Sequence, residues 1–309
     1  MLDVKRMRIL REVAARGSFS AAAEELYLSQ SAVSQQVAKL EQEVGVELLK
    51  RTNGGPEPTA AGKALIAHAE AVICRLEEAE RELAEIAGLG AGSLRMVSFP
   101  SASVTIAARA AARFRDRHPG VALSLSEGEP EESLPNLRAG RHEVAVVFDF
   151  EHYPFPPDRD IDLTPLVVEQ MSAVVCAGHP LAGKDSVRIE ELRDEPWLAG
   201  TTAGSCTQNI RIACEKAGFE PRIDFQSNDY TVMKRMIAEG LGVTLLPDLA
   251  LGDGLEGVVV LPVKPKPPVR RVWAATLAAG SRSPATEAMI ELLVEIAAAF
   301  EPRVPAKAA

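Results

Sequence analysis

The sequence predicts a mixed α/β chain that begins with a helix-turn-helix, continues through one long helix, and ends in a larger unit of alternating strands and helices. Three observations support this prediction. Apolar residues recur at helical spacing over residues 3–44, interrupted by two short turns. A heptad pattern runs from residue 65 to residue 86. Beyond residue 93, short runs rich in Val and Leu alternate with amphipathic segments.

The composition is that of a folded chain with room for more than one core. Its 309 residues are 47% hydrophobic, enough for two or three compact units. No apolar run approaches membrane-spanning length, and residues 1–10 carry charges among their apolar positions, unlike a secretory signal. The four cysteines lack paired metal-ligand spacing and suit a reducing compartment. We therefore expect a cytoplasmic protein with no membrane partner, metal site or cofactor.

Three helices are expected in residues 3–44. The first should end at Gly17, because glycine readily adopts the left-handed conformation that closes a helix. Ser29 is placed to cap the third helix, and the second and third helices together form a helix-turn-helix. The third helix has an apolar stripe made of Val33, Val37 and Leu40.

The opposite side of this third helix is short, polar and uncharged. Serine and glutamine form hydrogen bonds to base edges in the major groove, and the second helix of a helix-turn-helix makes such contacts through its first turns. Two packed amphipathic helices without a ligand are the simpler alternative. We expect double-stranded operator DNA as the partner. The candidate contacts are Gln30, Ser31, Ser34, Gln35 and Lys39, with Arg51 beyond the helix.

The segment SQSAVSQQVAKLEQEVGVELLKR, residues 29–51, resembles the N-terminal domain of LysR-type transcriptional regulators. Two positions depart from the family pattern: Ser31 stands where proline is common, and Gln35 where arginine is common. The missing arginine removes one candidate phosphate or guanine contact, which leaves the base preference open. The residues that match the pattern are Gln30, Ser34, Gln36, Leu40, Glu41, Gly45, Leu48 and Arg51.

Residues 46–56 suggest a small β-hairpin wing, punctuated by Gly55 and Pro56. Arg51 is then either a DNA contact or a charge at a helix terminus. The net charge is −9, yet residues 1–66 hold nine Lys and Arg against eight Asp and Glu. So small an excess predicts weak phosphate binding by a monomer. The phosphate contacts would come from a cluster of Lys5, Arg6, Arg8, Arg11, Lys50 and Arg51.

A long helix is expected over residues 59–87. Its heptad seam would pair two copies of the chain, while a solitary helix packed on its own domain is the alternative. In the resembling family this is the linker helix, which implies a homodimer or homotetramer. Gly88, Gly90 and Gly92 then mark a flexible hinge. The seam consists of Leu65, Ala69, Val72, Leu76, Ala79, Leu83 and Ile86.

The remainder of the chain alternates strand and helix; the first series, over residues 94–148, predicts a parallel sheet, and a second series begins at residue 166. Strands are expected at residues 94–99, 121–126, 144–148, 166–177, 197–199, 223–226, 243–246 and 269–276. Helices are expected at residues 104–117, 131–139, 189–193, 205–217, 230–239 and 284–300.

The segment SNDYTVMKRMIAEGLGVTLLPDLAL, with HPLAG at residues 179–183, resembles the effector domain of the same family. The resemblance implies two α/β lobes of periplasmic-binding-protein type, with chain crossings near residues 163–167 and 260–265. The expected domains are a winged helix-turn-helix at 1–58, a linker helix at 59–87, a hinge at 88–92 and an effector-binding domain at 93–309. Within the last, lobe I comprises 93–163 and 266–309, and lobe II comprises 164–265.

Two predicted helix N-termini face the cleft between these lobes. Free N–H groups there attract anions, so a small effector carrying a carboxylate or similar acceptor is one expectation. Glu127 would oppose an anion, which leaves the charge of the ligand open. Ser101 and Thr202 alternatively do no more than cap helices. The candidate effector contacts are Ser101, Ala102, Ser103, Glu127, Phe148, Thr201 and Thr202.

Other functions fit these residues less well. There is no nucleophile elbow, phosphate-binding glycine loop or metal-ligand histidine spacing, so we expect no catalytic residue and no enzyme. Cys206 at a helix N-terminus, where the dipole would lower its pKa, and Cys214 in the same helix suggest a redox-responsive regulator. Eight helical residues span about 12 Å, however, which is too far for a disulfide.

The prediction is therefore a DNA-binding transcriptional regulator controlled by a small-molecule effector, with RNA polymerase as a further candidate partner. A small-molecule binding protein without promoter function is a more distant alternative.

Overall fold

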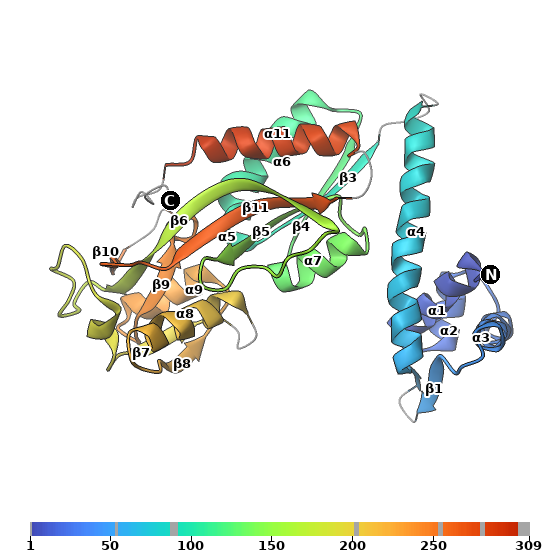
Figure 1. The fold of residues 1–309 in the computed structure, drawn as a ribbon, viewed down its shortest axis with the longest axis horizontal. Coiled ribbons are helices and arrows are strands. Elements are labelled where there is room, and N and C mark those ends of the chain that lie inside the picture. The colour runs from blue at the N-terminus through green and yellow to red at the C-terminus, as the bar shows by residue number, and fades with distance from the viewer. Residues whose placement is uncertain are drawn as a thin grey trace. The chain divides into compact units, whose positions relative to one another are not determined.

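The computed structural model describes residues 2–52, 55–86, 92–200, 204–252, 256–278 and 282–301 (Figure 1). The chain divides into two compact units, one made mainly of residues 1–92 and the other mainly of the chain from Ser93 onward, and each is described by itself. Residues 88–91 of the expected hinge lie outside the described residues, as do the effector candidates Thr201 and Thr202.

The first unit begins with the three predicted helices, α1 (Val4–Arg16), α2 (Phe19–Glu25) and α3 (Gln30–Val44). Gly17 closes α1 in the left-handed conformation with φ of 58°, as expected. Ser29 caps α3, because its side chain accepts a hydrogen bond from the backbone N–H of Ala32 at 3.2 Å. The helices enclose a common core that includes Leu10, Val13, Val33, Val37 and Leu40.

A two-stranded wing follows, formed by β1 (Leu49–Thr52) and β2 (Gly55–Pro58) in antiparallel pairing. It starts later than predicted, because the Glu41 carboxylate in α3 accepts from the backbone N–H groups of Leu48 and Leu49 at 2.8 and 3.1 Å. Gly55 has φ of 118°, and a Cβ there would lie 2.3 Å from the carbonyl oxygen of Gly17. Only glycine allows the wing to pass so close to the end of α1.

The long helix α4 (Ala60–Ile86) packs its inner face on α1, where Ala69 and Ile73 are buried with Met7. Val72 and Leu76 are 39% and 47% exposed. The expected seam therefore divides: Leu65 and Ala69 contact the chain's own first unit, and Val72 and Leu76 face outward.

The second unit contains a seven-stranded sheet with the order β10-β6-β11-β5-β3-β4, in which β9 also pairs with β6. Its strands are β3 (Ser93–Ser98), β4 (Ala122–Glu127), β5 (Val144–Phe150), β6 (Ile161–Cys176), β9 (Thr244–Pro247), β10 (Val258–Pro262) and β11 (Val269–Leu277). A second sheet pairs β7 (Pro196–Ala199) with β8 (Arg222–Gln226) in parallel.

The parallel sheet predicted for residues 94–148 is confirmed, whereas the strands after residue 160 join the same large sheet in antiparallel pairing. Strand β3 is parallel to β4 and β5, but β6 pairs antiparallel with β9, β10 and β11. The reason is that β11 returns to the first lobe alongside β6, so these neighbours are not joined by a single crossover helix. Strand β10 was not predicted, since its residues were assigned to a lobe crossing.

Strand β6 carries the chain from one lobe into the other without interruption. Residues 161–170 pair with β11, whereas Met171 and the residues after it pair with β9 and β10. The change of partners thus falls inside one strand, slightly later than the expected crossing at residues 163–167. Because one strand belongs to both lobes, side chains near its middle lie at the boundary between them.

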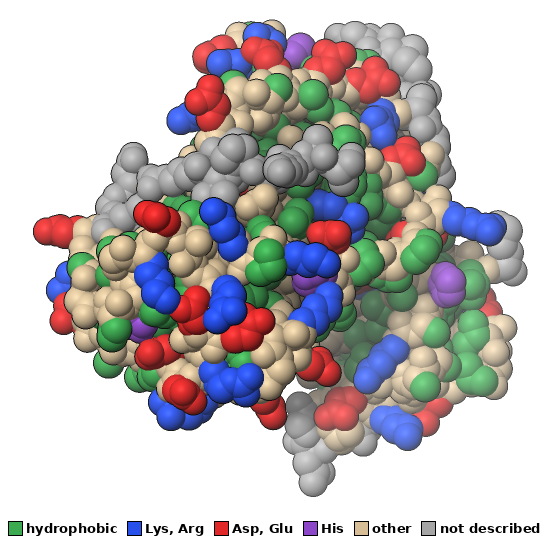
Figure 2. All heavy atoms as spheres, turned by 60° about the vertical axis from the view of Figure 1, so that its left-hand side comes forward, with side chains coloured by type: hydrophobic (Ala, Val, Ile, Leu, Met, Phe, Trp, Pro, Cys, Tyr) green, Lys and Arg blue, Asp and Glu red, His purple; other side chains and the backbone are tan. Residues whose placement is uncertain are grey.

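The predicted helices of the second unit occur in the predicted order, and two short helices, at residues 100–102 and 248–251, were not predicted. The helical segments are α5 (Pro100–Ala102), a π-helical turn η1 (Ser103–Ala107), α6 (Ala108–Arg117), α7 (Pro130–Arg138), a 3-10 turn η2 (Ile189–Leu192), α8 (Ser205–Lys216), α9 (Tyr230–Ala238), α10 (Asp248–Leu251) and α11 (Pro284–Ala298). Figure 1 shows α6 and α11 side by side over one face of the large sheet. Acidic and basic side chains are interspersed over the face seen in Figure 2, so the net charge of −9 is not gathered into one patch there.

Candidate DNA-binding surface and effector cavity

Helix α3 presents a polar face away from its core. Gln30, Ser31, Gln35 and Lys39 are exposed and Ser34 is partly exposed, while the apolar stripe on the other side is buried. Arg51 lies in β1, the first strand of the wing, although its side chain is outside the described part. The described structure therefore brings five of the six candidate DNA contacts onto one helix as accessible side chains.

Arg6 does not behave as the free cation that the sequence suggested. Its Nε donates to Gln36 Oε1 at 3.1 Å, its Nη1 donates to the Glu43 carboxylate, and its side chain is only 13% exposed. The expectation that Arg6 contacts phosphate is therefore wrong in this arrangement, because its charge is already used to hold α1 against α3. Gln36, which accepts the hydrogen bond from Arg6, likewise helps to hold α1 against α3.

Tyr27, in the turn between α2 and α3, has the most unusual backbone conformation among the described residues of the helix-turn-helix. It has φ of 54° and is 96% exposed. The Leu28 N–H donates to the Ala23 carbonyl at 2.9 Å, so Tyr27 occupies the position after a helix end where glycine is usual. A bulky side chain there costs about 1–2 kcal/mol, which makes this exposed ring a candidate functional residue.

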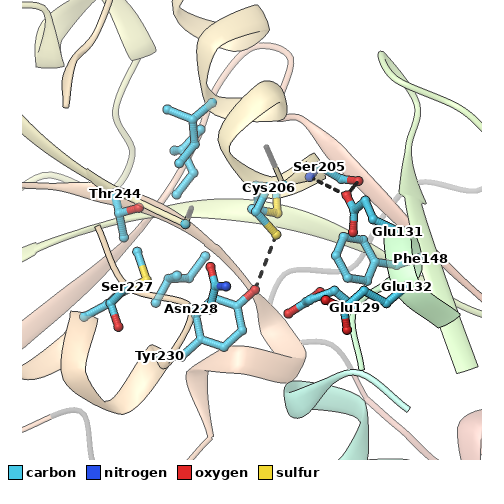
Figure 3. Close-up of a pocket in the computed structure, with 17 residues that line it drawn as sticks. Glu129, Glu131, Glu132, Phe148, Ser205, Cys206, Ser227, Asn228, Tyr230 and Thr244 are labelled. Carbon is cyan, nitrogen blue, oxygen red and sulfur yellow. Dashed lines mark hydrogen bonds between the residues drawn. The ribbon is translucent and has the colours of Figure 1, made fainter. Parts of the chain in front are cut away.

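A cavity of about 200 Å³ lies between the two lobes of the second unit (Figure 3). Strand β5 and helix α7 line it from one lobe, and α8, α9 and β9 line it from the other. Phe148, an expected effector contact, is part of its wall. The apolar lining consists of Phe148, Met171, Ile210, Met233, Leu245 and Leu246.

The other expected contacts from the first lobe do not line this cavity. Ser101 is 5% exposed and accepts a hydrogen bond from Arg270 Nη2 at 3.2 Å. Ala102 is fully buried, and the Ser103 hydroxyl donates to the Ser98 carbonyl at 3.3 Å. Glu127 is exposed at the end of β4. Ser101, Ala102 and Ser103 are therefore packed in the turn that follows β3, and Glu127 faces solvent.

Three glutamates that sequence reasoning missed gather on one side of the cavity: Glu129, Glu131 and Glu132 (Figure 3). The available signal was the run GEPEES at residues 128–133, directly between a strand and a helix. Glu131 and Glu132 of this run stand in the first turn of α7, where carboxylates interact favourably with the helix dipole.

Glu131 reaches from α7 to the N-terminus of α8 in the opposite lobe. Its Oε1 accepts from the Ser205 backbone N–H at 2.7 Å and also from the Ser205 hydroxyl. This helix N-terminus was expected to bind the carboxylate of an effector. In the structure the carboxylate of Glu131 occupies that helix N-terminus instead.

Glu129 is partly buried beside this contact. Burial, followed by the neighbouring Glu131, raises its pKa to about 7, and the positive charge of Arg270 opposes the shift. This carboxyl therefore changes its charge near neutral pH.

A buried ion pair supports the wall behind Phe148. Arg270 and Glu169 are both fully buried, and Arg270 Nη2 lies 2.7 Å from Glu169 Oε1. The guanidinium is stacked on the rings of Phe99 and Phe148, 5.0 Å from each ring centre.

Cys206 lies in the first turn of α8, as predicted, but the expected fall in its pKa is wrong. Burial raises the pKa of this thiol to about 11, and its Sγ is 3.6 Å from the Tyr230 hydroxyl. Cys214 is fully buried, and burial raises its pKa to about 12. Loss of solvation is the largest cause of both shifts in pKa, so the thiolate form of either cysteine is scarce at neutral pH.

Among the described residues there is no cluster of three His, Cys, Asp or Glu side chains able to hold a metal ion. Similarly, no described helix combines the length and apolar character needed to cross a membrane.

A helix-turn-helix unit joined through a long helix to a two-lobed unit with an interlobe cavity defines the class of ligand-controlled DNA-binding regulators. Residues 4–63 match the bacterial regulatory helix-turn-helix proteins of the lysR family, and residues 87–298 match the LysR substrate binding domain. The chain belongs to the LysR family of transcriptional regulators.

Individual relatives agree with this assignment over nearly the whole chain. The chain is 30% identical over 297 residues to the probable HTH-type transcriptional regulator LrrA of Synechococcus elongatus, covering 96% of this chain and 98% of LrrA. A full-length OxyR variant of Pseudomonas aeruginosa has a similar fold, with a TM-score of 0.70, 23% identity, and coverage of 95% of this chain and 98% of that one. For full-length CbnR in complex with its target DNA, the TM-score is 0.66 and the identity 20%, with coverage of 95% and 99%.

Proposed function

We propose that this LysR-family regulator reads a specific operator through the exposed polar face of α3. The observation that carries this proposal is the division of α3 into a buried stripe and an accessible side bearing Gln30, Ser31, Ser34 and Gln35. These short donors and acceptors suit base edges in the major groove. Lys39 and the wing residue Arg51 are further proposed contacts, and the similar protein CbnR is known in complex with its target DNA.

The second part of the proposal is control by a small molecule in the interlobe cavity. Its walls come from both lobes, so a ligand that touches both favours one arrangement of the lobes over others. Phe148 is the expected contact that lines this cavity, while Ser101 supports the wall through Arg270. Such a ligand acts on DNA binding only through its difference in affinity between the arrangements.

The third part is assembly. The exposed Val72 and Leu76 of α4 continue the heptad spacing and would pair two copies of the chain, so that two reading helices reach two half-sites. A pair of such dimers would form a homotetramer. In this proposal the protein acts in the cytoplasm and regulates transcription by RNA polymerase from the bound promoter.

The test is selection of binding sites from randomised duplex DNA with the full-length protein, followed by sequencing. We expect enrichment of an inverted repeat with half-sites about one helical turn apart. Enrichment of no sequence over the starting pool would refute operator recognition. Enrichment of a single, unrepeated half-site would refute the dimeric mode and leave recognition by α3 in place.

A further inference from the structure

The wall of the interlobe cavity is acidic, and we infer that its ligand is a small organic cation, an amine or guanidine carried on a short apolar body. This inference rests on the proposed function and specifies the ligand class of the same cavity. It reverses the expectation of an effector carboxylate.

The first observation is the balance of charge. The described lining contains Glu129, Glu131 and Glu132 but no Lys, Arg or His. Figure 3 shows the three carboxylates together at one side of the cavity. An anion entering here would meet like charges at short range, whereas a cation would find several acceptors.

The second observation concerns the helix N-terminus in the described cavity wall, where an anion would otherwise bind. The N-terminus of α8 offers a backbone N–H and the Ser205 hydroxyl, and both already donate to Glu131. A ligand carboxylate would have to displace Glu131 and leave a further negative charge in the cavity. The internal carboxylate therefore excludes the ligand class that a free helix N-terminus would attract.

The third observation is that Glu129 lacks a local partner. Among the described residues, no hydrogen-bond donor contacts its carboxyl group, although the residue is partly buried at the cavity wall. Its raised pKa of about 7 shows that an ionised Glu129 is poorly compensated. The charged and titratable groups around it are Glu127, Glu131, Glu132, Arg270, Cys206 and Tyr230.

The positive charge of Arg270 does not neutralise the excess of negative charge at Glu129. It is fully buried behind Phe148, and its charge is paired with Glu169 at 2.7 Å. It lowers the pKa of Glu129, but burial and Glu131 outweigh it. A cation inside the cavity could contact Glu129 directly, which the guanidinium does not do among the described contacts.

The size and walls of the cavity define the rest of the ligand. A volume of about 200 Å³ is below the range of roughly 300–1,000 Å³ found for drug-sized ligands. The lining also includes the apolar side chains of Met171, Ile210 and Leu245. The rings of Phe148 and Tyr230 lie near the glutamates (Figure 3). A short aliphatic chain with a cationic end matches a small cavity whose lining combines apolar side chains with carboxylates.

The test uses full-length protein and a matched panel: aliphatic amines and guanidines of two to six carbons, with the alcohol and the carboxylate of each length. Calorimetry and thermal shift at pH 7.5 should detect binding of a cationic member and weaker or absent binding of its neutral and anionic counterparts. Glu129→Gln should weaken that binding about tenfold or more. Glu215→Gln, which removes an exposed carboxylate on α8 outside the cavity, should leave it unchanged.

A pH series adds a readout specific to Glu129. Because the cation favours the ionised carboxylate, binding near pH 7 should release protons and strengthen as the pH rises from 6 to 8, and Glu129→Gln should abolish both effects. Tighter binding of a carboxylate, equal effects of the two Gln variants, or no binding by any cationic member would overturn the inference.

Operator binding measured with the same compounds separates this inference from the proposed function. A carboxylate that changes operator affinity would refute the cationic class and leave effector control intact. Cations that bind through Glu129 without changing operator affinity would support the ligand class and refute effector control.

Discussion

The guanidinium of Arg270 and the carboxylate of Glu169 are 2.7 Å apart, and neither side chain reaches solvent. The pair joins β11 to β6, and Glu169 also accepts from the Leu249 N–H at 2.8 Å. Arg270 in turn holds Ser101 and stacks on two phenylalanines beside the cavity. Removing one partner leaves a buried charge uncompensated, a more serious loss than removing both.

Arg270→Met should therefore lower the free energy of unfolding by about 3–5 kcal/mol. The double variant Arg270→Met/Glu169→Gln should recover part of this loss. Urea unfolding followed by fluorescence of the buried Trp197 provides the measurement. Arg222→Met, which breaks an exposed pair with Asp224, is the control and should change stability by less than about 1 kcal/mol. A loss no larger than the control's would contradict the importance of the buried pair.

Glu129 should make stability depend on pH between its ordinary pKa of 4.5 and its folded pKa of about 7. In this interval the folded state retains a proton that the unfolded chain has released, so stability falls as the pH rises. Glu129→Gln should then be more stable than wild type at pH 8, by on the order of 1–2 kcal/mol given its partial exposure, with no gain at pH 4. Equal differences at both pH values would show that its titration does not contribute.

Ser34→Ala and Gln35→Ala should each weaken binding to the selected operator by about 1–3 kcal/mol while changing binding to random DNA little. Fluorescence anisotropy at fixed salt measures both affinities. Gln42→Ala, on an exposed position nearer the end of the same helix, is the matched control. Equal losses on operator and random DNA would assign the two residues to phosphate contacts instead of base reading.

Leu76→Asp should dissociate the dimer and reduce operator affinity, because two like charges would meet where the apolar side chains pair. Light scattering measures the mass, and anisotropy the affinity. Ala67→Asp introduces the same charge at an exposed position on the opposite side of α4 and should preserve the dimer. If Leu76→Asp keeps the wild-type mass, the exposed stripe is not the dimer contact.

Cys206→Ser and Cys214→Ser should keep regulation, and peroxide should not alter operator binding by the wild type. Burial raises the pKa of both thiols, to about 11 and about 12, so the reactive thiolate is scarce at neutral pH. Labelling of Cys206 and Cys214, followed by mass spectrometry of the peptides that contain them, should accordingly be slow in the native protein relative to the unfolded chain. Rapid labelling of Cys206, or loss of regulation in its variant, would restore the redox alternative.

The amino-acid sequence alone was sufficient to predict the features that depend on neighbouring residues or on a pattern shared by the family. The caps at Gly17 and Ser29, the apolar stripe of α3 and the order of strands and helices depend on residues close together in the chain. The exposed polar face of α3 was predictable because a period of 3.6 residues determines which side chains share a side. The antiparallel pairing of β6 and β11 was not, because most of the second lobe lies between these strands in the sequence.

The residues that line the cavity, and their charge, are determined by the tertiary structure. Only folding brings Glu131 to Ser205, 74 positions along the chain, and so replaces an expected ligand carboxylate with an internal one. Burial, which no local pattern shows, moves the pKa of Glu129 to about 7 and that of Cys206 in the direction opposite to the one its helix position suggested. By itself the sequence determined the family and the helix-turn-helix. The charge of the cavity wall arises from solvation and from contacts between distant segments, and these exist only in the folded chain.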